Sequence, residues 1–468
     1  MQMIGIASVL LAACVFWPAY AQVLTERDLA QIVYHNHPVI KQAKLLPGFA
    51  AQEIRYATGA FDPKLEVHWY EKDLKGINYY RQWDNFIKTP IWIGDFKTGY
   101  ERYTGINVNP ESFTPPQGYF YFELQIPLTR NLVIDAHRAA LFQARQLTQM
   151  NAAERQKAVN KTMFYAVKSY WDWFDAHKAY ALQEYGVRIA RFRLDGIREG
   201  VLTGDNAPAD TLEAHLELLK RLQSLAEAEL RRNNAKIVVS TFVWSDEGQP
   251  AELKDSVVPV DTFIAQPLPR SLEDSLAALA GQAHPEILKS LAKIKQLEIE
   301  VKLQRQQLIP LLDFDFKPLF IPGTQILKPE NLLGTFKLGA NFYTSLFMRK
   351  ERAKLELSKL KVQSARWDLD DKRRQAEAGV RAAYNELKQL ASLIELQGRT
   401  VATARLMLEV ENTRFDNGES SLFVVTARER SLLSEKEKNI SYLAKYAKAR
   451  VALFEAAGVP LEDWFYAN

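Results

Sequence analysis

Apolar residues recur at three- and four-residue intervals along two long stretches of the chain, residues 132–199 and 349–417. Lys and Glu occupy much of the remaining faces, and neither stretch contains a proline. This spacing predicts amphipathic helices that pack sideways on other helices. At 1.5 Å per residue each would be about 100 Å long, which is too long for a compact domain. Shorter return helices are predicted over residues 209–232 and 421–454.

The long helices are predicted to end in tight turns at the tips of two helical hairpins. Gly418 can adopt a left-handed conformation that ends a helix, and Ser420 or Ser421 can cap the next one. A related turn occupies residues 204–210. The candidate tip residues are Gly204, Asp205, Asp210, Phe415, Gly418, Glu419, Ser420 and Val424. Two interpretations of Asp210 stay open, an acid that lines an aperture and an acid in the first turn of a helix.

Strict alternation of apolar and polar residues predicts β-strands at residues 65–69 and 119–126, and again at 312–316 and 335–342. Additional residues between the first two strands either add further strand or lengthen a loop. Aromatic side chains of these strands fit a belt at a membrane interface, with the core of a soluble β-sandwich as the alternative. The candidate belt residues are Trp69, Tyr70, Tyr119, Tyr121, Phe342 and Tyr343.

The same order of elements occurs twice, which indicates a tandem duplication. Leu29-Ala30 and His37-Pro38 recur in the same register as Leu276-Ala277 and His284-Pro285. Each His-Pro pair lies in a predicted helix, over residues 25–59 and 271–307, and the repeated setting favours a structural role for the histidines over metal binding. A short strand is predicted over residues 238–244. The resulting division is a signal peptide at 1–21, a first repeat at 22–250, a linker at 251–270, a second repeat at 271–458 and a tail at 459–468.

The first residues of the chain predict export. Residues 3–21 are almost wholly apolar and end in Ala-Tyr-Ala, a small-residue cleavage pattern before Gln22. A competing pattern, Leu-Ala-Ala-Cys, would make Cys14 a site of lipidation. Cys14 is the single cysteine, which excludes disulfides within the chain. No later run is long and apolar enough for a transmembrane helix.

Charge and motifs point away from nucleic acid and from catalysis. The 60 basic and 56 acidic residues nearly balance, and no basic cluster is interleaved with aromatics. The sequence lacks the common metalloprotease, phosphate-loop and nucleophile-elbow motifs, and its carboxylates are dispersed along helices. We therefore expect no enzyme activity and no cofactor.

An exported chain can still cross a membrane as a closed barrel, but four strands are too few to close one. Several copies would have to assemble. At this point the ordered set of features resembles the TolC-like outer-membrane efflux proteins: the duplicated Leu-Ala and His-Pro unit, the strands in each copy, the long hairpins and the tip sequence at residues 418–423. The resemblance covers nearly the whole mature chain.

The resemblance implies a mainly helical fold with a small membrane β part. Long hairpins would form a periplasmic α-barrel, and four strands from each of three chains would complete a twelve-stranded barrel in the outer membrane of a Gram-negative bacterium. The implied partners are two further copies, a periplasmic adaptor, an inner-membrane pump and outer-membrane lipid. The implied function is a passive exit duct for drugs, small molecules or secreted polypeptides, in tripartite efflux or type I secretion.

Gating residues of the family carry over only in part. Asp210 lies six residues after Gly204, as an acidic constriction residue does in the best-known member. Val424 occupies the equivalent place in the second tip, and Phe415 and Ser420 stand where that member has a tyrosine and an arginine. The alternative function is a periplasmic coiled-coil adaptor or scaffold without a pore, and a lipid-anchored duct is a third interpretation.

Overall fold

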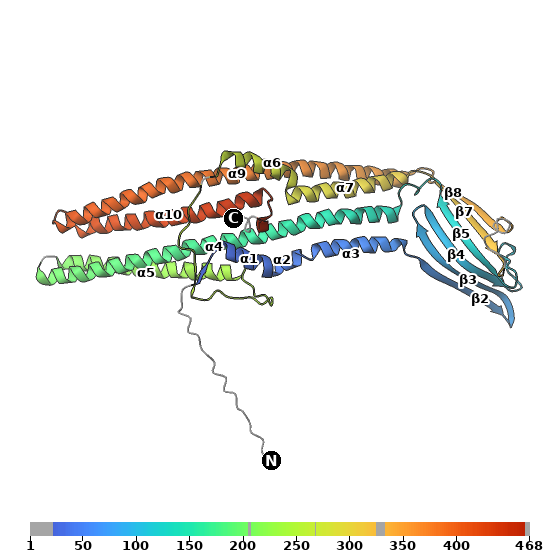
Figure 1. Cartoon of the computed structure of the whole chain (residues 1–468), viewed down its shortest axis with the longest axis horizontal. Coiled ribbons are helices and arrows are strands. Elements are labelled where there is room, and N and C mark those ends of the chain that lie inside the picture. Colours follow the sequence, from blue (N-terminus) through green and yellow to red (C-terminus); the bar gives the residue numbers. More distant parts are fainter. Residues whose placement is uncertain (1–21, 205–206, 267, 324–332, 464–468) are drawn as a thin grey trace, which may run out of the picture. The chain divides into compact units, whose positions relative to one another are not determined.

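The protein is described by a computed structural model that covers residues 22–204, 207–266, 268–323 and 333–463. The predicted signal peptide, Cys14 and Asp205 lie outside these ranges. The predicted fold class, mainly helical with a small sheet and a tandem duplication, is confirmed (Figure 1). The chain divides into two compact units. The helical unit consists of the described parts of Met1–Lys41, Val159–Leu276 and Gly379–Asn468, and the sheet unit of Gln42–Ala158 and Ala277–Ala378.

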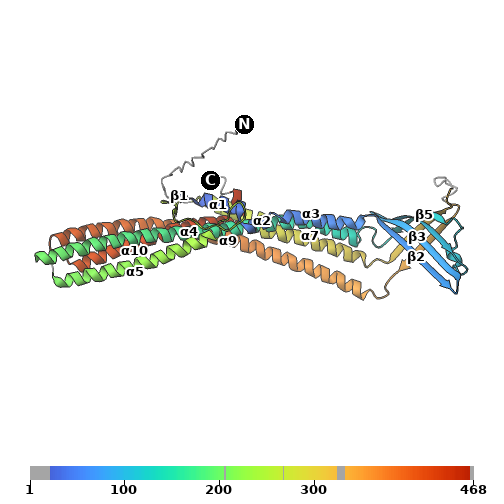
Figure 2. The same ribbon diagram turned by 90° about the horizontal axis from the view of Figure 1, so that it is seen from below.

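The four helices predicted for the two hairpins are present. The long helices are α4 (Ala136–Thr203) and α9 (Arg349–Asp416), each of 68 residues. The return helices are α5 (Pro208–Ser240) and α10 (Leu422–Ala456), which lie beside the C-terminal parts of α4 and α9 (Figure 2). In the helical unit the predicted apolar stripe of α4 is buried, because Val167, Tyr170 and Trp171 are at most 2% exposed.

The predicted helices that contain the His-Pro pairs are broken in the structure, which corrects that expectation. The first copy forms α1 (Glu26–Asn36), α2 (Pro38–Ala43) and α3 (Leu46–Thr58), and the second forms α6 (Arg270–Ala283) and α7 (Pro285–Gln306). The physical reason is that proline disfavours helical geometry in the residue before it. His37 and His284 take extended backbone conformations at these breaks, with ψ of 129° and 135°.

Both histidines cap the helix that follows. The Nδ1 atom of His37 accepts a hydrogen bond from the backbone N–H of Val39, and that of His284 from the backbone N–H of Glu286. Burial lowers the pKa of each imidazole below its usual value of 6.5. The neutral form that can accept this bond is therefore the one favoured in the folded chain.

Acidification is expected to weaken these caps. Because the folded-state pKa values lie below those of the unfolded chain, stability is complete above pH 6.5 and is lost as the pH falls below it. We expect the apparent unfolding temperature to drop between about pH 7.5 and about pH 5.5. Asparagine also caps helices but does not titrate, so the variant H37N/H284N should show a smaller drop in calorimetry. An equal drop in both proteins would contradict this role of the histidines.

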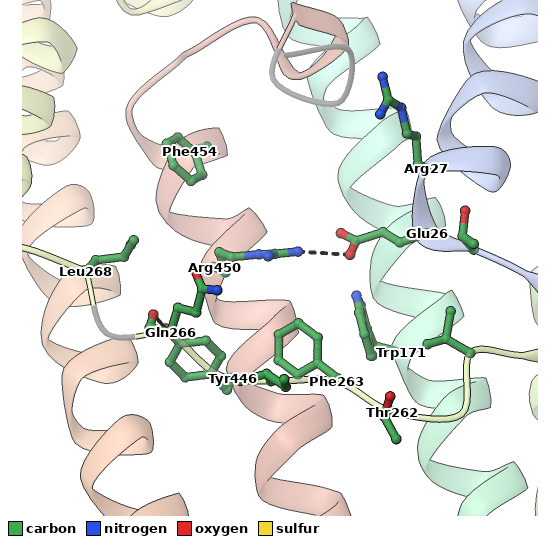
Figure 3. A pocket seen from close by; sticks show the side chains of 13 residues that line it. Glu26, Arg27, Trp171, Thr262, Phe263, Gln266, Leu268, Tyr446, Arg450 and Phe454 are labelled. Carbon is green, nitrogen blue, oxygen red and sulfur yellow. Dashed lines mark hydrogen bonds and ion pairs between the residues drawn. The ribbon is translucent and has the colours of Figure 1, made fainter. Parts of the chain in front are cut away.

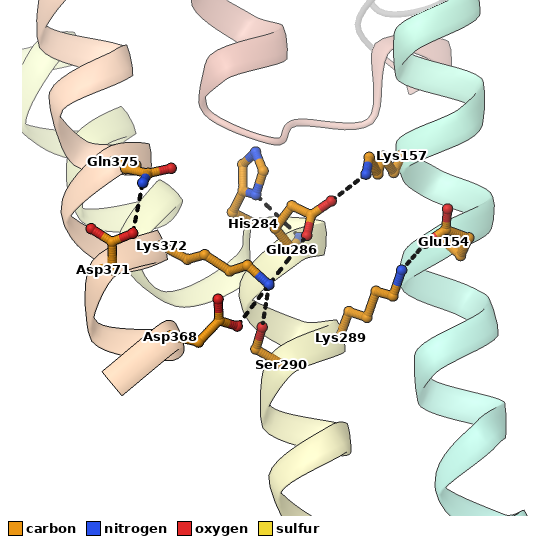
Figure 4. Close-up of polar contacts among 10 residues, drawn as sticks. All are labelled: Glu154, Lys157, His284, Glu286, Lys289, Ser290, Asp368, Asp371, Lys372 and Gln375. Atoms are coloured by element: carbon orange, nitrogen blue, oxygen red, sulfur yellow. Dashed lines mark hydrogen bonds and ion pairs between the residues drawn. The ribbon is translucent and has the colours of Figure 1, made fainter. Parts of the chain in front are cut away.

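A polar network surrounds the second His-Pro break in the sheet unit and links three helices (Figure 4). The carboxylate of Glu286 on α7 pairs with Lys157 of α4 and lies 3.7 Å from the ammonium nitrogen of Lys372 on α9. The hydrogen bond from Lys157 lowers the pKa of Glu286. Lys289 of α7 pairs with Glu154 of α4 at 2.6 Å. Glu286, which directly follows the second His-Pro pair, thus holds α7 against α4 and α9.

The sheet of the sheet unit has six strands and not the four that were predicted. Its strands are β2 (Lys64–Leu74), β3 (Ile77–Ile91), β4 (Gly94–Thr104), β5 (Tyr119–Pro127), β7 (Leu311–Phe320) and β8 (Phe336–Tyr343). They follow one another in this order and every pair is antiparallel (Figure 1). The additional residues of the first copy therefore add strand, because β3 and β4 continue the hydrogen-bonded ladder between β2 and β5.

The strand predicted at residues 238–244 is also wrong. Helix α5 continues to Ser240, and Val239 is fully buried on its inner face. Tertiary burial outweighs the β-propensity of the two adjacent valines. A short strand does occur nearby, because β6 (Val257–Pro259) pairs in parallel with β1 (Gln22–Leu24). Two short 3₁₀ turns, η1 (Gly59–Phe61) and η2 (Pro110–Ser112), complete the elements that the structure describes.

Candidate functional site

The two hairpin tips bring most of the predicted site residues into the helical unit. Gly204 follows α4 and Gly418 follows α9, with φ of +89° and +77°. Residues with a side chain rarely adopt these angles, so glycine fits both turns. The N–H of Gly418 donates to the carbonyl oxygen of Phe415, and that of Glu419 to the carbonyl oxygen of Arg414. These bonds satisfy the free carbonyl groups at the end of α9.

Asp210 lies in the first turn of α5, where its carboxylate accepts a hydrogen bond from the backbone N–H of Ala207 at 3.2 Å. The side chain is half-buried and stabilises the start of the helix. This observation supports the interpretation of Asp210 as a first-turn acid.

The predicted residues of the second tip have separate contacts. Phe415 packs against a buried cluster that includes Leu194, Ala214 and Leu422, so it joins the two hairpins. The Ser420 hydroxyl donates to a carboxylate oxygen of Glu411 at 2.5 Å. Val424 is half-buried, whereas Glu419 is exposed.

Charged links between the hairpins were missed by sequence reasoning. Arg193 of α4 pairs with Glu429 of α10 at 2.5 Å. Glu217 of α5 accepts hydrogen bonds from Arg221 on its own helix at 2.8 Å and from the Nε atom of Arg430 on α10 at 3.0 Å. The sequence contains one signal for the link made by Glu217. This acid lies beside Ala214 and Leu218, on the face of a predicted amphipathic helix that packs against other helices.

The ionised form of Glu217 is favoured although the residue is buried. Burial opposes ionisation, but the hydrogen bonds and charges of Arg430 and Arg221 outweigh it and lower the pKa of Glu217. Only 7% of the residue is exposed. A carboxylate with two guanidinium partners can therefore hold α5 against α10 at neutral pH.

The candidate belt residues divide between the two faces of the sheet. Trp69 and Phe342 are exposed to 61% and 67% on one face. Tyr70, Tyr119 and Tyr343 project to the other face, because side chains alternate along each strand. Tyr121 also lies there, is 2% exposed, and donates its hydroxyl hydrogen to Asp84 at 2.9 Å. It is therefore part of the packing on this face and not of an exposed aromatic belt.

The helical unit also contains a cavity of about 720 Å³ among α1, α4, α10 and the segment before α6 (Figure 3). Trp171, Phe263 and Tyr446 line it. Arg450 donates to the carboxylate of Glu26 at 2.9 Å across it. The indole nitrogen of Trp171 points toward the same carboxylate. Burial raises the pKa of Glu26, and Arg450 and Trp171 oppose that rise.

In the part of the chain that the structure covers, no helix has both the length and the apolar character needed to span a membrane. Among the same residues no group of histidine, cysteine and carboxylate side chains has the arrangement of a metal site.

The fold is similar to those of solved outer-membrane channels. It is similar to the structure of the Neisseria gonorrhoeae MtrE outer membrane channel, with a TM-score of 0.69 and 15% identity over 93% of this chain and 89% of that one. Similarity extends to the Campylobacter jejuni CmeC outer membrane channel, with a TM-score of 0.64 and 15% identity over 92% and 85% of the two chains. For the Vibrio cholerae outer membrane protein VceC the values are 0.65 and 13% over 93% and 96%.

Residues 276–459 match the family described as outer membrane efflux protein. The resemblance to the TolC-like outer-membrane efflux proteins is thereby confirmed. At the identities given above, the similar structures establish the shared fold. No curated protein matches the sequence.

Proposed function

We propose that the protein is a passive exit duct of the Gram-negative outer membrane that extends into the periplasm and serves tripartite efflux or type I secretion. The observation that carries this proposal is the efflux-family match over residues 276–459 within a chain whose fold is that of outer-membrane channels. Energy would come from an inner-membrane pump.

The working form would be a homotrimer surrounded by outer-membrane lipid. Two features of a single chain support assembly. The two edge strands of its sheet have no partner among the described residues, and its long helices carry apolar side chains that remain exposed, among them Phe192, Trp367 and Leu406. A periplasmic adaptor would contact the tips around Gly204 and Gly418, where exposed Leu202, Leu212 and Phe423 offer apolar contacts.

Conductance across a planar lipid bilayer tests the proposed function. Trimers purified from outer membranes should give discrete, long-lived current steps when they insert. A periplasmic coiled-coil adaptor or scaffold would remain in the aqueous phase and give no steps. Absence of steps from protein that is folded by circular dichroism would contradict the duct and favour the scaffold.

Ion selectivity tests the contribution of Asp210. If three copies of Asp210 face the aperture, the variant D210N should lower the cation-to-anion permeability ratio by roughly twofold, because one charge at a few ångströms in water contributes less than about 1 kcal/mol. Reversal potentials in a salt gradient give the ratio. The variant D210E keeps the charge and should match the parent. If D210N keeps the permeability ratio of the parent protein, Asp210 does not line the aperture and only stabilises the first turn of α5.

A further inference from the structure

The six-stranded sheet has one largely apolar and one polar face, and this division is clear on β2, β5, β7 and β8 and weaker on β3 and β4. Residues that are directly paired in neighbouring strands project to the same face. The register therefore assigns every strand residue to a face. Starting at Val67 on β2, one face is apolar on β5, β7 and β8 and, apart from Glu71, on β2. On β3 and β4 the same face also carries the polar residues Arg81, Asn85, Thr89, Thr98, Arg102 and Thr104. Its members include Leu65, Val67, Trp69, Trp83, Ile87, Phe96, Phe120, Phe122, Leu124, Phe314, Phe316, Leu338 and Phe342.

The opposite face is mostly polar, and several of its charges are paired between strands. Lys317 of β7 lies 2.6 Å from the buried carboxylate of Glu101 on β4, and Lys97 of β4 lies 2.7 Å from Glu123 of β5. Asn341 of β8 donates to Asp315 of β7 at 2.9 Å. A small apolar cluster of Phe86, Tyr121 and Leu319 lies among these charges.

On the added strands β3 and β4 the apolar residues of this face are Trp83, Ile87, Ile91, Phe96 and Tyr100, and Arg81 and Arg102 interrupt the apolar face near one end. On β3, Trp83 and Ile87 of the apolar face are exposed to 46% and 43%, although large apolar side chains gain from leaving water. If water surrounded this hairpin on both faces, nothing would favour large apolar residues on the same face as Val67 and Trp69 of β2. Lipid contact with the part of this face away from Arg81 and Arg102 accounts for the pattern.

The edges of the sheet indicate what completes it. The outer edges of β2 and β8 have no partner among the described residues of the chain, and unpaired backbone groups are costly inside a membrane. Six strands are fewer than the eight of the smallest membrane barrels. Because the number of strands is even and all neighbours are antiparallel, β8 of one copy is antiparallel to β2 of the next, so the alternation continues without a break.

We propose that β3 and β4 are part of the membrane wall, so that three copies of this chain form a barrel of eighteen strands in which β2 of each copy pairs with β8 of a second copy. The inference rests on the proposed outer-membrane trimer and concerns the number of strands in its wall. Since barrel diameter grows roughly linearly with strand number, the pore would be about one and a half times as wide as with twelve strands.

Cysteine labelling tests the position of β3. Single-cysteine variants at Trp83 and Ile87 probe the apolar face, and variants at Gln82 and Lys88 probe the polar face. A charged, membrane-impermeant maleimide is applied to trimers in isolated outer membranes. Leu338→Cys and Lys337→Cys serve as the matched pair on β8, a strand that belongs to the wall with either strand number. The parent protein, whose single cysteine Cys14 lies in the predicted signal peptide, gives the background.

The proposal predicts labelling at Gln82→Cys and Lys88→Cys at least about tenfold faster than at Trp83→Cys and Ile87→Cys, as for Lys337→Cys against Leu338→Cys, because lipid excludes a charged probe. Equal labelling of both faces of β3, with the β8 pair still distinct, would overturn the eighteen-stranded wall and leave the duct intact. Loss of the distinction on β8 as well would overturn the proposed outer-membrane duct together with this inference.

Discussion

The variant E217Q is expected to raise the mean conductance of the reconstituted duct by about tenfold, because hydrogen bonds to charged groups are worth roughly 1.5–3 kcal/mol. Glu217 joins α5 to Arg430 of α10, and so holds one hairpin against the other close to the tips. The uncharged amide would leave Arg221 and Arg430 without their carboxylate partner. Separated tips would then be populated more often. Single-channel recordings measure the open fraction and the conductance.

A matched control lies on the same helix. Glu227 of α5 is exposed, so E227Q removes the same charge and should leave the conductance at the parental value. The variant E429Q, which breaks the link to Arg193, should change the conductance in the same direction as E217Q. Unchanged currents in both E217Q and E429Q would show that these links do not restrain the tips.

The variant R450L is expected to destabilise the helical unit by about 3 kcal/mol or more, because removal of one member of a buried ion pair leaves the other charge unpaired. Arg450 is the charged partner of Glu26, whose pKa is already raised by burial. Without Arg450 that pKa should rise further. Stability is then complete below the usual value of 4.5 and is lost as the pH rises through the folded-state pKa.

Thermal unfolding at about pH 5 and about pH 7.5 measures this effect. The loss of stability in R450L should be greater at the higher pH. The variant K448L is the control, since Lys448 on the same helix pairs with the half-exposed Asp172 and such pairs contribute about 0–1 kcal/mol. Adding E26Q to R450L should restore part of the stability. A similar loss in K448L and R450L, with no dependence on pH, would contradict the role given to this pair.

The helical hairpins could be predicted from the sequence because apolar residues recur at helical spacing over long, uninterrupted stretches. The start of α9 at Arg349 was predicted to the residue, and Gly204 and Gly418 marked both turns. The tandem order of elements followed from the repeated His-Pro pairs. These features are local, so the sequence carries them without knowledge of packing.

The strand number and the charged links depend on contacts between distant residues. On β3 and β4 the apolar face includes the polar residues Asn85 and Thr98, which obscures the alternation, and only the ladder with β2 and β5 shows these segments as strands. Arg193 and Glu429 are 236 residues apart in sequence, and Glu217 and Arg430 are 213 apart. No spacing rule pairs residues at such distances, so these links require the structure.

The central claim, that the chain assembles into a duct in the outer membrane, is tested most directly by the native mass of the protein after detergent extraction from purified outer membranes. The account predicts a detergent-corrected mass of three chains of 53.5 kDa, less the mass of any cleaved signal peptide. Recovery of a monomer or dimer from the periplasm without detergent would contradict it.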